Sequence, residues 1–320
     1  MYLFLSVNKK FLLEIIEEMN IRWDWLGKLY NILFEFLTLN SFKYQKVSKF
    51  MEWFYTLKVL DLDSYNTFLI YWFGACVLNA FYLHKSKELP LSNRIESQGM
   101  GALGSIDKKT GWVLMEIPIL LVVWYFFSQS QTGLNVSSFL SVSGIMVGFF
   151  MMHYFNRAVI YPQRIKVAGK TMPVYTMLTS MVFYTVNGYL IGHYFGQLRD
   201  YPIEWLYDPR FLIGVALFLF GFFVNIHSDN ILINLRDDGE SGYKIPHGGF
   251  FKYVSCPNYF GECLEWIGFA IMTWSSIGFV YAAWVVLPLF IQARITHKWY
   301  LDQYGDSYPK SRKAIIPSLI

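Results

Sequence analysis

Residues 225–268 read NIHSDNILINLRDDGESGYKIPHGGFFKYVSCPNYFGECLEWIG, a polar stretch that joins two strongly apolar segments. It places Asp, Asn, Arg, Tyr and Glu side chains at the ends of those segments. Ionisable groups are costly inside a bilayer, so those that occur there usually mark a functional site. The stretch therefore predicts a membrane fold and also the place of a site within it.

The composition of the whole chain supports a membrane protein. Hydrophobic residues make up 54% of the 320 residues and charged residues only 16%, whereas a typical soluble domain has about 25% charged residues. The 29 Phe, 23 Tyr and 11 Trp residues give an aromatic excess of the kind found at membrane interfaces. The formal net charge is only +4, and the basic residues are spread among loops, so they form no basic patch that would bind nucleic acid. We therefore expect an integral membrane protein without a nucleic-acid partner.

Apolar runs near the length that crosses a bilayer, about 20 residues, predict an all-α fold with seven transmembrane helices. The runs lie near residues 66–84, 112–128, 136–155, 173–195, 211–229, 254–274 and 276–295. Lys and Arg residues are concentrated in the loops after the first, third, fifth and seventh runs. By the positive-inside rule, these loops and the C-terminus lie in the cytoplasm.

Residues 1–65 differ from the rest because their apolar positions are mixed with charged ones, as in FLLEIIEEM. This pattern is typical of amphipathic helices that lie at a membrane surface. Charged residues interrupt the apolar stretches and no small-residue cleavage site follows, which argues against a signal peptide. We expect an N-terminal interfacial extension over residues 1–65 and a seven-helix membrane domain over residues 66–320.

Four polar residues of the opening stretch fall on two predicted helix ends. Asn225 and Asp229 close the fifth span, and Asn258 and Glu262 open the sixth. The members of each pair are four residues apart, so they share one face of their helix. Both helix ends are cytoplasmic in the predicted orientation. The spacing therefore indicates one polar pocket that is open to cytosolic solutes.

Glu116 and Tyr154 fall at the same predicted depth, near the cytoplasmic ends of the second and third spans. Each also has a structural interpretation, because a Glu near a helix start interacts with the helix dipole and a Tyr at a helix end is commonly an interfacial aromatic. The acids of the two pairs above can be partners in structural ion pairs. His153 is better explained as a hydrogen-bonded helix residue than as a ligand. The convergence of several such residues at one depth favours a site.

Several motifs carry a resemblance to a known family. NIHSD, Y-K-I-P-x-G-G-x-F-x-Y-V-S, N-Y-F-G-E and E-W-I-G-F-A, with HKWYLDQYGDSYPKSRKAIIP near the end, are similar to the C-terminal signature of the steroid 5-alpha-reductase family. W-V-L-M-E-I-P, which contains Glu116, and H-Y-F-N-R, which contains Tyr154, resemble two further family motifs. The resemblance implies a membrane-embedded oxidoreductase that reduces the 4,5 double bond of 3-oxo-Δ4 steroids with NADPH.

The resemblance implies that Tyr154 and Glu116 are catalytic and hold the C3 carbonyl of the steroid while a hydride passes to C5. These residue types suit the chemistry because conjugate hydride addition places negative charge on the carbonyl oxygen, where a hydrogen-bond donor stabilises the enolate. A Tyr hydroxyl donates without being ionised at neutral pH. A Glu can donate as well, or can hold the Tyr hydroxyl in position.

For NADPH, the resemblance implies a cofactor site built mostly by residues 225–320. The matching positions are Asn225, Asp229, Arg236, Tyr243, Asn258, Glu262, His297, Tyr300 and Arg312. Arg236 suits a phosphate, since guanidinium groups bind phosphates through two parallel hydrogen bonds. No G-x-G-x-x-G motif follows a predicted strand, so a Rossmann site is not expected. No metal site is expected either. Met115 departs from the family pattern, in which a Gln that helps to hold the nicotinamide precedes the catalytic Glu.

Two alternative functions stay open. Relatives that share the Y-V-S-C-P-N-Y segment reduce trans-2-enoyl-CoA thioesters or polyprenols, whereas NIHSD and G-E-x-x-E-W-I-G-F-A favour the steroid branch. A seven-helix receptor or transporter is a more remote alternative, because the seventh span has no Lys for a Schiff base and no half of the chain is repeated. We expect a monomer in the lipid bilayer, in the endoplasmic reticulum of a eukaryote or the inner membrane of a bacterium, with its active site facing the cytosol.

Overall fold

The computed structural model describes residues 60–86, 104–129, 140–167, 169–235 and 244–319. The chain forms two compact units, Tyr2–Asp61 and a larger one that spans Leu62–Ile320. The predicted N-terminal extension falls almost entirely outside the described residues. All of the described helices belong to the larger unit.

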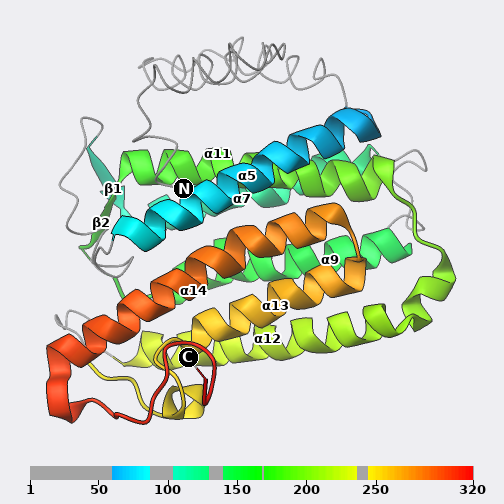
Figure 1. Ribbon diagram of the computed structural model, residues 1–320. Helices are drawn as coiled ribbons and strands as arrows, with labels where there is room; N and C mark the ends of the chain where they lie inside the picture. The colour runs from blue at the N-terminus through cyan, green and yellow to red at the C-terminus, as the bar shows by residue number, and fades with distance from the viewer. Residues whose placement is uncertain (1–59, 87–103, 130–139, 168, 236–243, 320) are drawn as a thin grey trace. The chain divides into compact units, whose positions relative to one another are not determined.

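Seven helices of 14 residues or more form the larger unit, counted within the described residues (Figure 1). They are α5 (Leu62–Ser86), α7 (Lys108–Ser128), α9 (Val142–Phe155), α11 (Val174–His193), α12 (Pro209–Asn234), α13 (Pro257–Thr273) and α14 (Ser276–Tyr304). Each coincides with one predicted span, so the prediction of a helical fold is confirmed. Four of them, α5, α7, α12 and α14, are long and apolar enough to cross a membrane. The count of seven spans and their orientation stay predictions.

Shorter elements connect these helices. They are the π-helical turns η1 (Asn156–Ile160) and η2 (Tyr194–Leu198), the short helix α10 (Tyr161–Arg164) and the 3-10 turns η3 (Ile203–Tyr207), η4 (Gly249–Lys252) and η5 (Gly305–Ser307). Two strands, β1 (Ser105–Asp107) and β2 (Thr171–Pro173), pair antiparallel with Ile106 opposite Met172. The all-α prediction missed this pair, because three residues are too few to show the alternation that indicates a strand.

Side-chain caps determine where four of the helices begin. Asp107, Ser141, Asp208 and Ser275 each accept a hydrogen bond from a backbone N–H in the first turn of α7, α9, α12 and α14. Asp and Ser are among the preferred residues at this position, since they satisfy an N–H group that has no partner within the helix. Asp208 also accepts from the Arg210 guanidinium at 2.8 Å, and these hydrogen bonds lower the pKa of Asp208 to about 2.

Helices α12 and α13 approach each other through glycine faces. A Cβ atom at Gly261 would lie 2.5 Å from the backbone N of Asn225 and 2.6 Å from the carbonyl oxygen of Gly221, which is closer than real Cβ contacts. Gly214 and Gly268 meet in the same way farther along the two helices. Helix α13 packs in turn against α14, α14 against α5, and α7 against α11 (Figure 1). The glycine contacts bring the polar ends of α12 and α13 next to each other.

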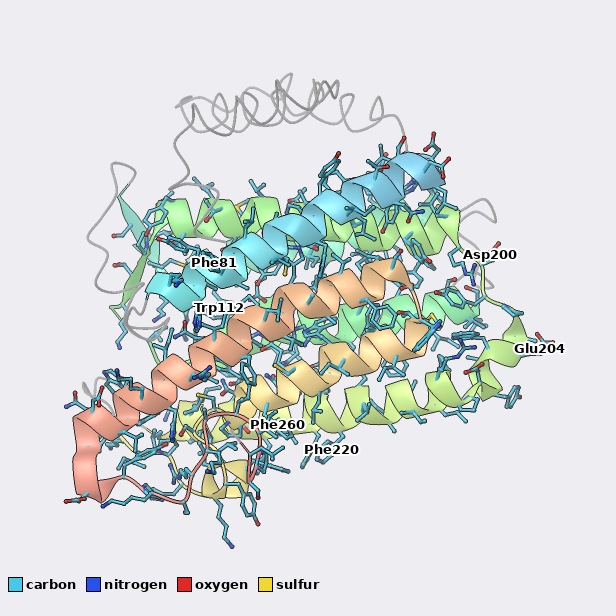
Figure 2. All side chains as sticks on the ribbon, viewed as in Figure 1. Phe81, Trp112, Asp200, Glu204, Phe220 and Phe260 are labelled. Carbon is cyan, nitrogen blue, oxygen red and sulfur yellow. The ribbon has the colours of Figure 1, made fainter. Side chains whose placement is uncertain are left out.

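The outer faces of the helices are apolar. Phe81 of α5 is 60% exposed and Phe220 of α12 is 46% exposed. Other exposed Leu, Ile and Phe side chains follow the same two helices. Asp200 and Glu204 instead lie in the connection between α11 and α12, at one end of the helices (Figure 2). Such apolar faces suit contact with lipid tails. Lipid tails offer no hydrogen-bond partners, so polar groups are expected at the ends of the helices.

Candidate active site

The end of α9 and the turn after it supply three polar side chains of the candidate site, those of His153, Tyr154 and Arg157. The π-helical turn η1 begins directly after Phe155. A π-helical turn adds one residue to the helical repeat and is frequent at functional sites. Arg157 lies four residues after His153, so it faces the same polar cluster as the end of α9.

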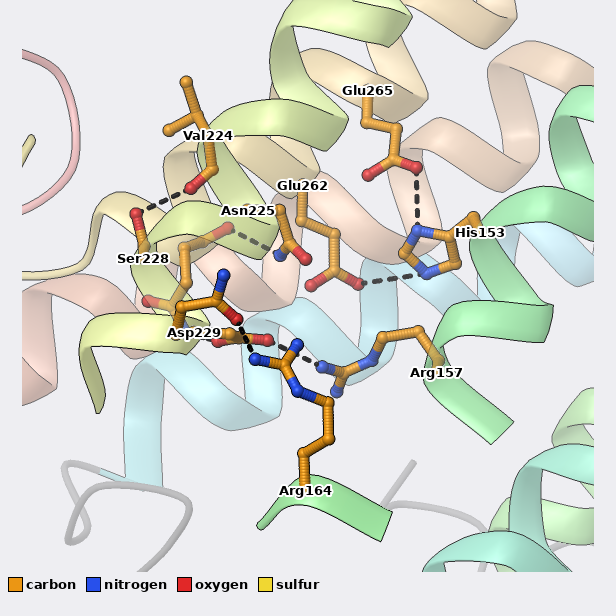
Figure 3. A network of polar contacts seen from close by, with 11 residues as sticks. His153, Arg157, Arg164, Val224, Asn225, Ser228, Asp229, Glu262 and Glu265 are labelled. Carbon is orange, nitrogen blue, oxygen red and sulfur yellow. Dashed lines mark hydrogen bonds and ion pairs between the residues drawn. The ribbon is translucent and has the colours of Figure 1, made fainter. Parts of the chain in front are cut away.

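His153 links α9 to α13 (Figure 3). Its Nδ1 atom lies 2.8 Å from Oε1 of Glu265, and its Nε2 atom lies 4.0 Å from Oε1 of Glu262. His153 is 2% exposed and Glu265 is fully buried. Buried polar groups of this kind are normally hydrogen-bonded. The expectation that His153 is a hydrogen-bonded helix residue is confirmed.

Arg157 links the extension of α9 to α12. Its guanidinium donates to Oδ2 of Asp229 at 3.1 Å (Figure 3). It also lies over the Tyr161 ring, 4.5 Å from the centroid. Its charge also acts on Glu116 and Glu262. One cation therefore stands among three carboxylates, which reduces their mutual repulsion. The sequence alone gave no role to Arg157, although the H-Y-F-N-R motif contains it.

Asn225 and Asn258 join the polar ends of α12 and α13. The Asn225 amide donates to the carbonyl oxygen of Asn258 at 3.0 Å, and the Asn258 amide donates to Oδ1 of Asp229 at 3.3 Å. Within the described residues, Oδ1 of Asn225 is buried without a hydrogen-bond partner. The four residues of the two predicted pairs are thus brought together, and they keep one acceptor available to a ligand.

Tyr154 faces tyrosines from two other helices. Its hydroxyl is hydrogen-bonded to the hydroxyl of Tyr281 on α14, and its ring packs edge-on against Tyr184 of α11 with the centroids 5.7 Å apart. The Tyr184 phenol and the buried Glu116 carboxyl in turn lie close enough to interact electrostatically. Glu116 is 2% exposed, and its Oε2 atom has no partner among the described residues. Tyr184 is thus a neighbour of both residues that the sequence predicted to be catalytic.

The sequence analysis did not single out Tyr184 or Tyr281. Both lie within apolar helices and outside every motif quoted above. Tyr281 belongs to a core of packed rings, with centroids 4.8 Å from Trp266 and 5.2 Å from Phe150. The available signal was a polar hydroxyl inside a span, where a buried Tyr needs a partner for its O–H group.

A second cluster lies at the C-terminal end of α14 and contains His297, Tyr300 and Arg312. Nδ1 of His297 lies 2.6 Å from Oγ of Ser255, which lies 2.6 Å from the Tyr308 hydroxyl. The Tyr300 ring stacks on the Tyr308 ring with the centroids 5.1 Å apart. Burial raises the pKa of Tyr308, so its hydroxyl stays neutral and both donates and accepts.

Arg312 provides unpaired donors in the second cluster. The side chain is 4% exposed and donates from one NH2 group to the carbonyl oxygen of Pro246 at 2.9 Å. Its other terminal nitrogen and its Nε are buried without partners in the part of the chain that the structure describes. A cavity of about 270 Å³ is lined by Arg294, His297, Lys313, Ala314 and Leu319. Buried guanidinium donors without partners among the described residues favour an anion, and so does the basic lining of this cavity.

Some predicted features have other outcomes. Arg236 and Tyr243 lie outside the described residues, so their cofactor contacts stay predictions. Met115, where a Gln was expected, packs in a buried cluster with Met172 and Met177 and acts as a core residue. The described residues contain no group of three or more His, Cys, Asp or Glu side chains that suits a metal ion.

Comparison with known proteins places this chain among named relatives. Residues 170–320 match the model of a family described as 3-oxo-5-alpha-steroid 4-dehydrogenase. The 3-oxo-5-alpha-steroid 4-dehydrogenase 1 of Bos taurus is 48% identical over 176 residues, which cover 55% of this chain and 68% of the relative. The steroid 5-alpha-reductase DET2 of Gossypium hirsutum is 42% identical over 67% of this chain and 82% of the relative. The Homo sapiens 3-oxo-5-alpha-steroid 4-dehydrogenase 1 is 41% identical over 67% and 81%.

Proposed function

The chain belongs to the 3-oxo-5-alpha-steroid 4-dehydrogenase family, also named steroid 5-alpha-reductases, and we propose that it reduces the 4,5 double bond of a 3-oxo-Δ4 steroid with NADPH. The observation that supports the proposal is the burial of Glu116 and Tyr154, with Tyr184 packed edge-on against the Tyr154 ring. An acid and a phenol that are both shielded from water suit a site that polarises a ketone.

The donor set fits a nicotinamide dinucleotide. Arg312 has buried N–H groups without partners in the described residues, and phosphate oxygens are suitable acceptors for them. Oδ1 of Asn225 is a buried acceptor without a partner there, and it suits an amide or hydroxyl donor. Asp229 and Glu262 are further acceptors for ribose hydroxyls. When bound, NADPH supplies the hydride that reaches C5 of the steroid.

Tyr154 and Glu116 hold the carbonyl oxygen at C3. As C5 receives the hydride, electrons of the double bond move toward this oxygen and give it negative charge. The Tyr154 hydroxyl donates to the oxygen and stabilises the charge as it forms. The interaction is strong because both side chains are buried, and a low dielectric strengthens hydrogen bonds to a developing charge.

His153 and Arg157 hold the carbonyl-binding part of the site against the predicted cofactor residues. His153 precedes Tyr154 directly and contacts α13, while Arg157 follows three residues later and contacts Asp229 of α12. Small displacements between reacting groups cost rate steeply, so such links support catalysis without touching the substrate. Both residues are therefore expected to position the site.

The proposal includes a membrane topology. The four helices that are long and apolar enough to cross a membrane point to a membrane protein. Seven spans, a cytoplasmic C-terminus, a cytosolic active site and a monomeric state belong to the proposal. The orientation is tested with two separate variants, Lys310→Cys and Glu204→Cys. Each is labelled with a membrane-impermeant reagent on sealed vesicles, and the wild type with its three buried cysteines gives the background. Only one of the two positions should react from the cytosolic side, and that position should be Lys310.

The direct test is NADPH oxidation by the detergent-purified full chain. Testosterone, progesterone and a trans-2-enoyl-CoA are offered separately, and products are identified by mass. A 5α-dihydro steroid is expected from at least one steroid. Oxidation with the thioester alone would contradict the steroid assignment and move the protein to the enoyl-CoA branch. No oxidation with any of them would contradict the reductase function.

A further inference from the structure

We propose that Tyr281 is a positioning residue of the reaction. It donates its hydroxyl proton to the Tyr154 oxygen, so that the proton of Tyr154 is available to the carbonyl oxygen of the substrate. This inference rests on the proposed reduction of a 3-oxo-Δ4 steroid and deepens it. Tyr281 acts through Tyr154 and does not itself contact the reacting atoms.

The two hydroxyls are held facing each other by the rings around them. The Tyr281 ring is fully buried, with its centroid 4.8 Å from that of Trp266 and 5.2 Å from that of Phe150. The Tyr154 ring contacts the same two residues, at 5.0 Å from Phe150 and 5.9 Å from Trp266. Close-packed rings do not turn freely in a protein core. The oxygen atoms are thus fixed, and the freedom that remains is the rotation of the O–H protons.

A count of protons decides which hydroxyl donates when substrate is bound. Two phenol hydroxyls carry two protons, and they share only one of them in a hydrogen bond. If Tyr154 donated to Tyr281, its proton would be used and it would offer no donor to a ketone. A ketone oxygen is only an acceptor. The Tyr154 proton therefore turns to the ketone, and the shared proton must come from Tyr281.

The donor from Tyr281 has a second effect. As the ketone oxygen gains negative charge, it draws the Tyr154 proton toward itself and leaves negative charge on the Tyr154 oxygen. A hydrogen bond into that oxygen stabilises this charge, because successive hydrogen bonds polarise one another. The effect appears only in the transition state, so it raises kcat and leaves substrate binding unchanged.

The alternative is a purely structural role, in which the Tyr281 hydroxyl takes the Tyr154 hydroxyl as a partner only because a buried polar group needs a hydrogen bond. Tyr65 shows the usual arrangement for a buried Tyr, since its hydroxyl donates to the backbone carbonyl of Leu190 at 3.0 Å. Tyr281 instead has the hydroxyl of Tyr154 as its partner. A Phe at this position would fill the same ring cluster without adding a polar atom to the core. The hydroxyl at 281 is therefore explained by what it does to Tyr154.

The test compares Tyr281→Phe, Tyr154→Phe and the double variant, with Tyr65→Phe as the matched control, in the purified full chain. Tyr281→Phe should lower kcat about tenfold, as expected for the loss of one hydrogen bond to a charged group, with KM for the steroid and the Kd of NADPH unchanged. In the Tyr154→Phe background it should have no further effect, because its partner hydroxyl is already gone. Tyr65→Phe should keep kcat, and its Tm serves as the reference for the loss of one buried hydroxyl in Tyr281→Phe.

Two results would overturn the inference alone. They are a kcat of Tyr281→Phe within twofold of the wild type, and an equal tenfold loss in the Tyr154→Phe background. If Tyr281→Phe does not fold, 3-fluorotyrosine at position 281 keeps the hydroxyl and should keep kcat near the wild-type value; a tenfold loss would overturn the inference. Absence of steroid reduction by the wild type would instead overturn the proposed function, and this inference with it.

Discussion

His153 and Glu265 form a buried hydrogen bond, 2.8 Å from Nδ1 to Oε1, that joins α9 to α13. Tyr154 follows His153 directly, and Glu262 lies one helical turn before Glu265. The bond therefore sets the separation between the residue proposed to hold the steroid carbonyl and a residue proposed to hold the cofactor. By joining α9 to α13, the bond holds these two parts of the proposed site together.

Replacement of Glu265 should destabilise the protein. Glu265→Leu leaves the buried His153 imidazole without its partner, which costs about 1–3 kcal/mol. Glu265→Gln keeps a hydrogen-bonding group and should lose less. Thermal unfolding in detergent measures the difference, and Glu204→Gln, in an exposed 3-10 turn, is the control. An unchanged Tm in Glu265→Leu would show that the bond does not stabilise the fold.

Tyr154→Phe should abolish most turnover and leave NADPH bound. The variant removes the donor to the carbonyl oxygen and keeps the ring packing, and the loss of one such donor lowers kcat about 100-fold or more. Steroid reduction and NADPH affinity are measured on the same preparation, with Tyr207→Phe, at an exposed tyrosine, as the control. Unchanged turnover in Tyr154→Phe would remove this residue from the mechanism.

Arg312→Ala should weaken NADPH binding. The variant removes buried N–H donors that have no protein partner within the described residues, and hydrogen bonds to charged groups contribute about 1.5–3 kcal/mol each. A Kd increase of about tenfold or more is expected from titration of purified protein. Lys310→Ala is the control, because Lys310 is exposed and pairs with the exposed Asp306. A normal NADPH affinity in Arg312→Ala would contradict the phosphate assignment.

Arg236→Ala is expected to weaken NADPH binding as well, on the sequence motif alone. The same titration measures the effect. If Arg312→Ala weakens binding and Arg236→Ala does not, the phosphate contacts belong to the C-terminal cluster and the motif assignment of Arg236 is wrong.

Gly261→Ala should force α12 and α13 apart. The added Cβ would lie 2.5 Å from the backbone N of Asn225 and 2.6 Å from the carbonyl oxygen of Gly221, and backbone atoms yield only if a helix moves. We expect a lower Tm and a loss of NADPH binding. Gly148→Ala on α9 is the control, since its Cβ would meet no atom within 4 Å. Equal Tm and affinity in the two variants would contradict the close glycine contact.

The helices were predictable because they follow from apolar runs of sufficient length. Their ends were less so, and α14 shows why. The predicted span closes at residue 295, where the apolar run ends, but the helix continues to Tyr304. Residues 296–304 contain neither Gly nor Pro, and Gly305, with φ of +51°, ends the helix. Hydropathy marks the expected membrane boundary, whereas backbone conformation marks the helix end.

The pairs within one helix were also predictable, and the pairs between helices were not. Asn225 with Asp229 follows from the spacing of a helix. The bonds of His153 to Glu265 and of Tyr154 to Tyr281 join residues that are 112 and 127 positions apart. These bonds depend on which helix faces pack against each other. The faces of these apolar helices differ little in sequence, so one sequence alone does not show which faces are neighbours.

The contact of α12 with α13, backbone against backbone, has a consequence for ligand exchange. The close glycine contacts resist sliding of one helix along the other. We therefore expect the helix ends that carry Asn225 and Asn258 to move as one rigid unit. Side-chain hydrogen bonds, such as the one from Arg157 to Asp229, join this unit to the extension of α9. Such hydrogen bonds break and re-form more readily than packed backbones separate. If the proposed cofactor leaves through this part of the site, we expect α12 and α13 to move together and the Arg157–Asp229 ion pair to break.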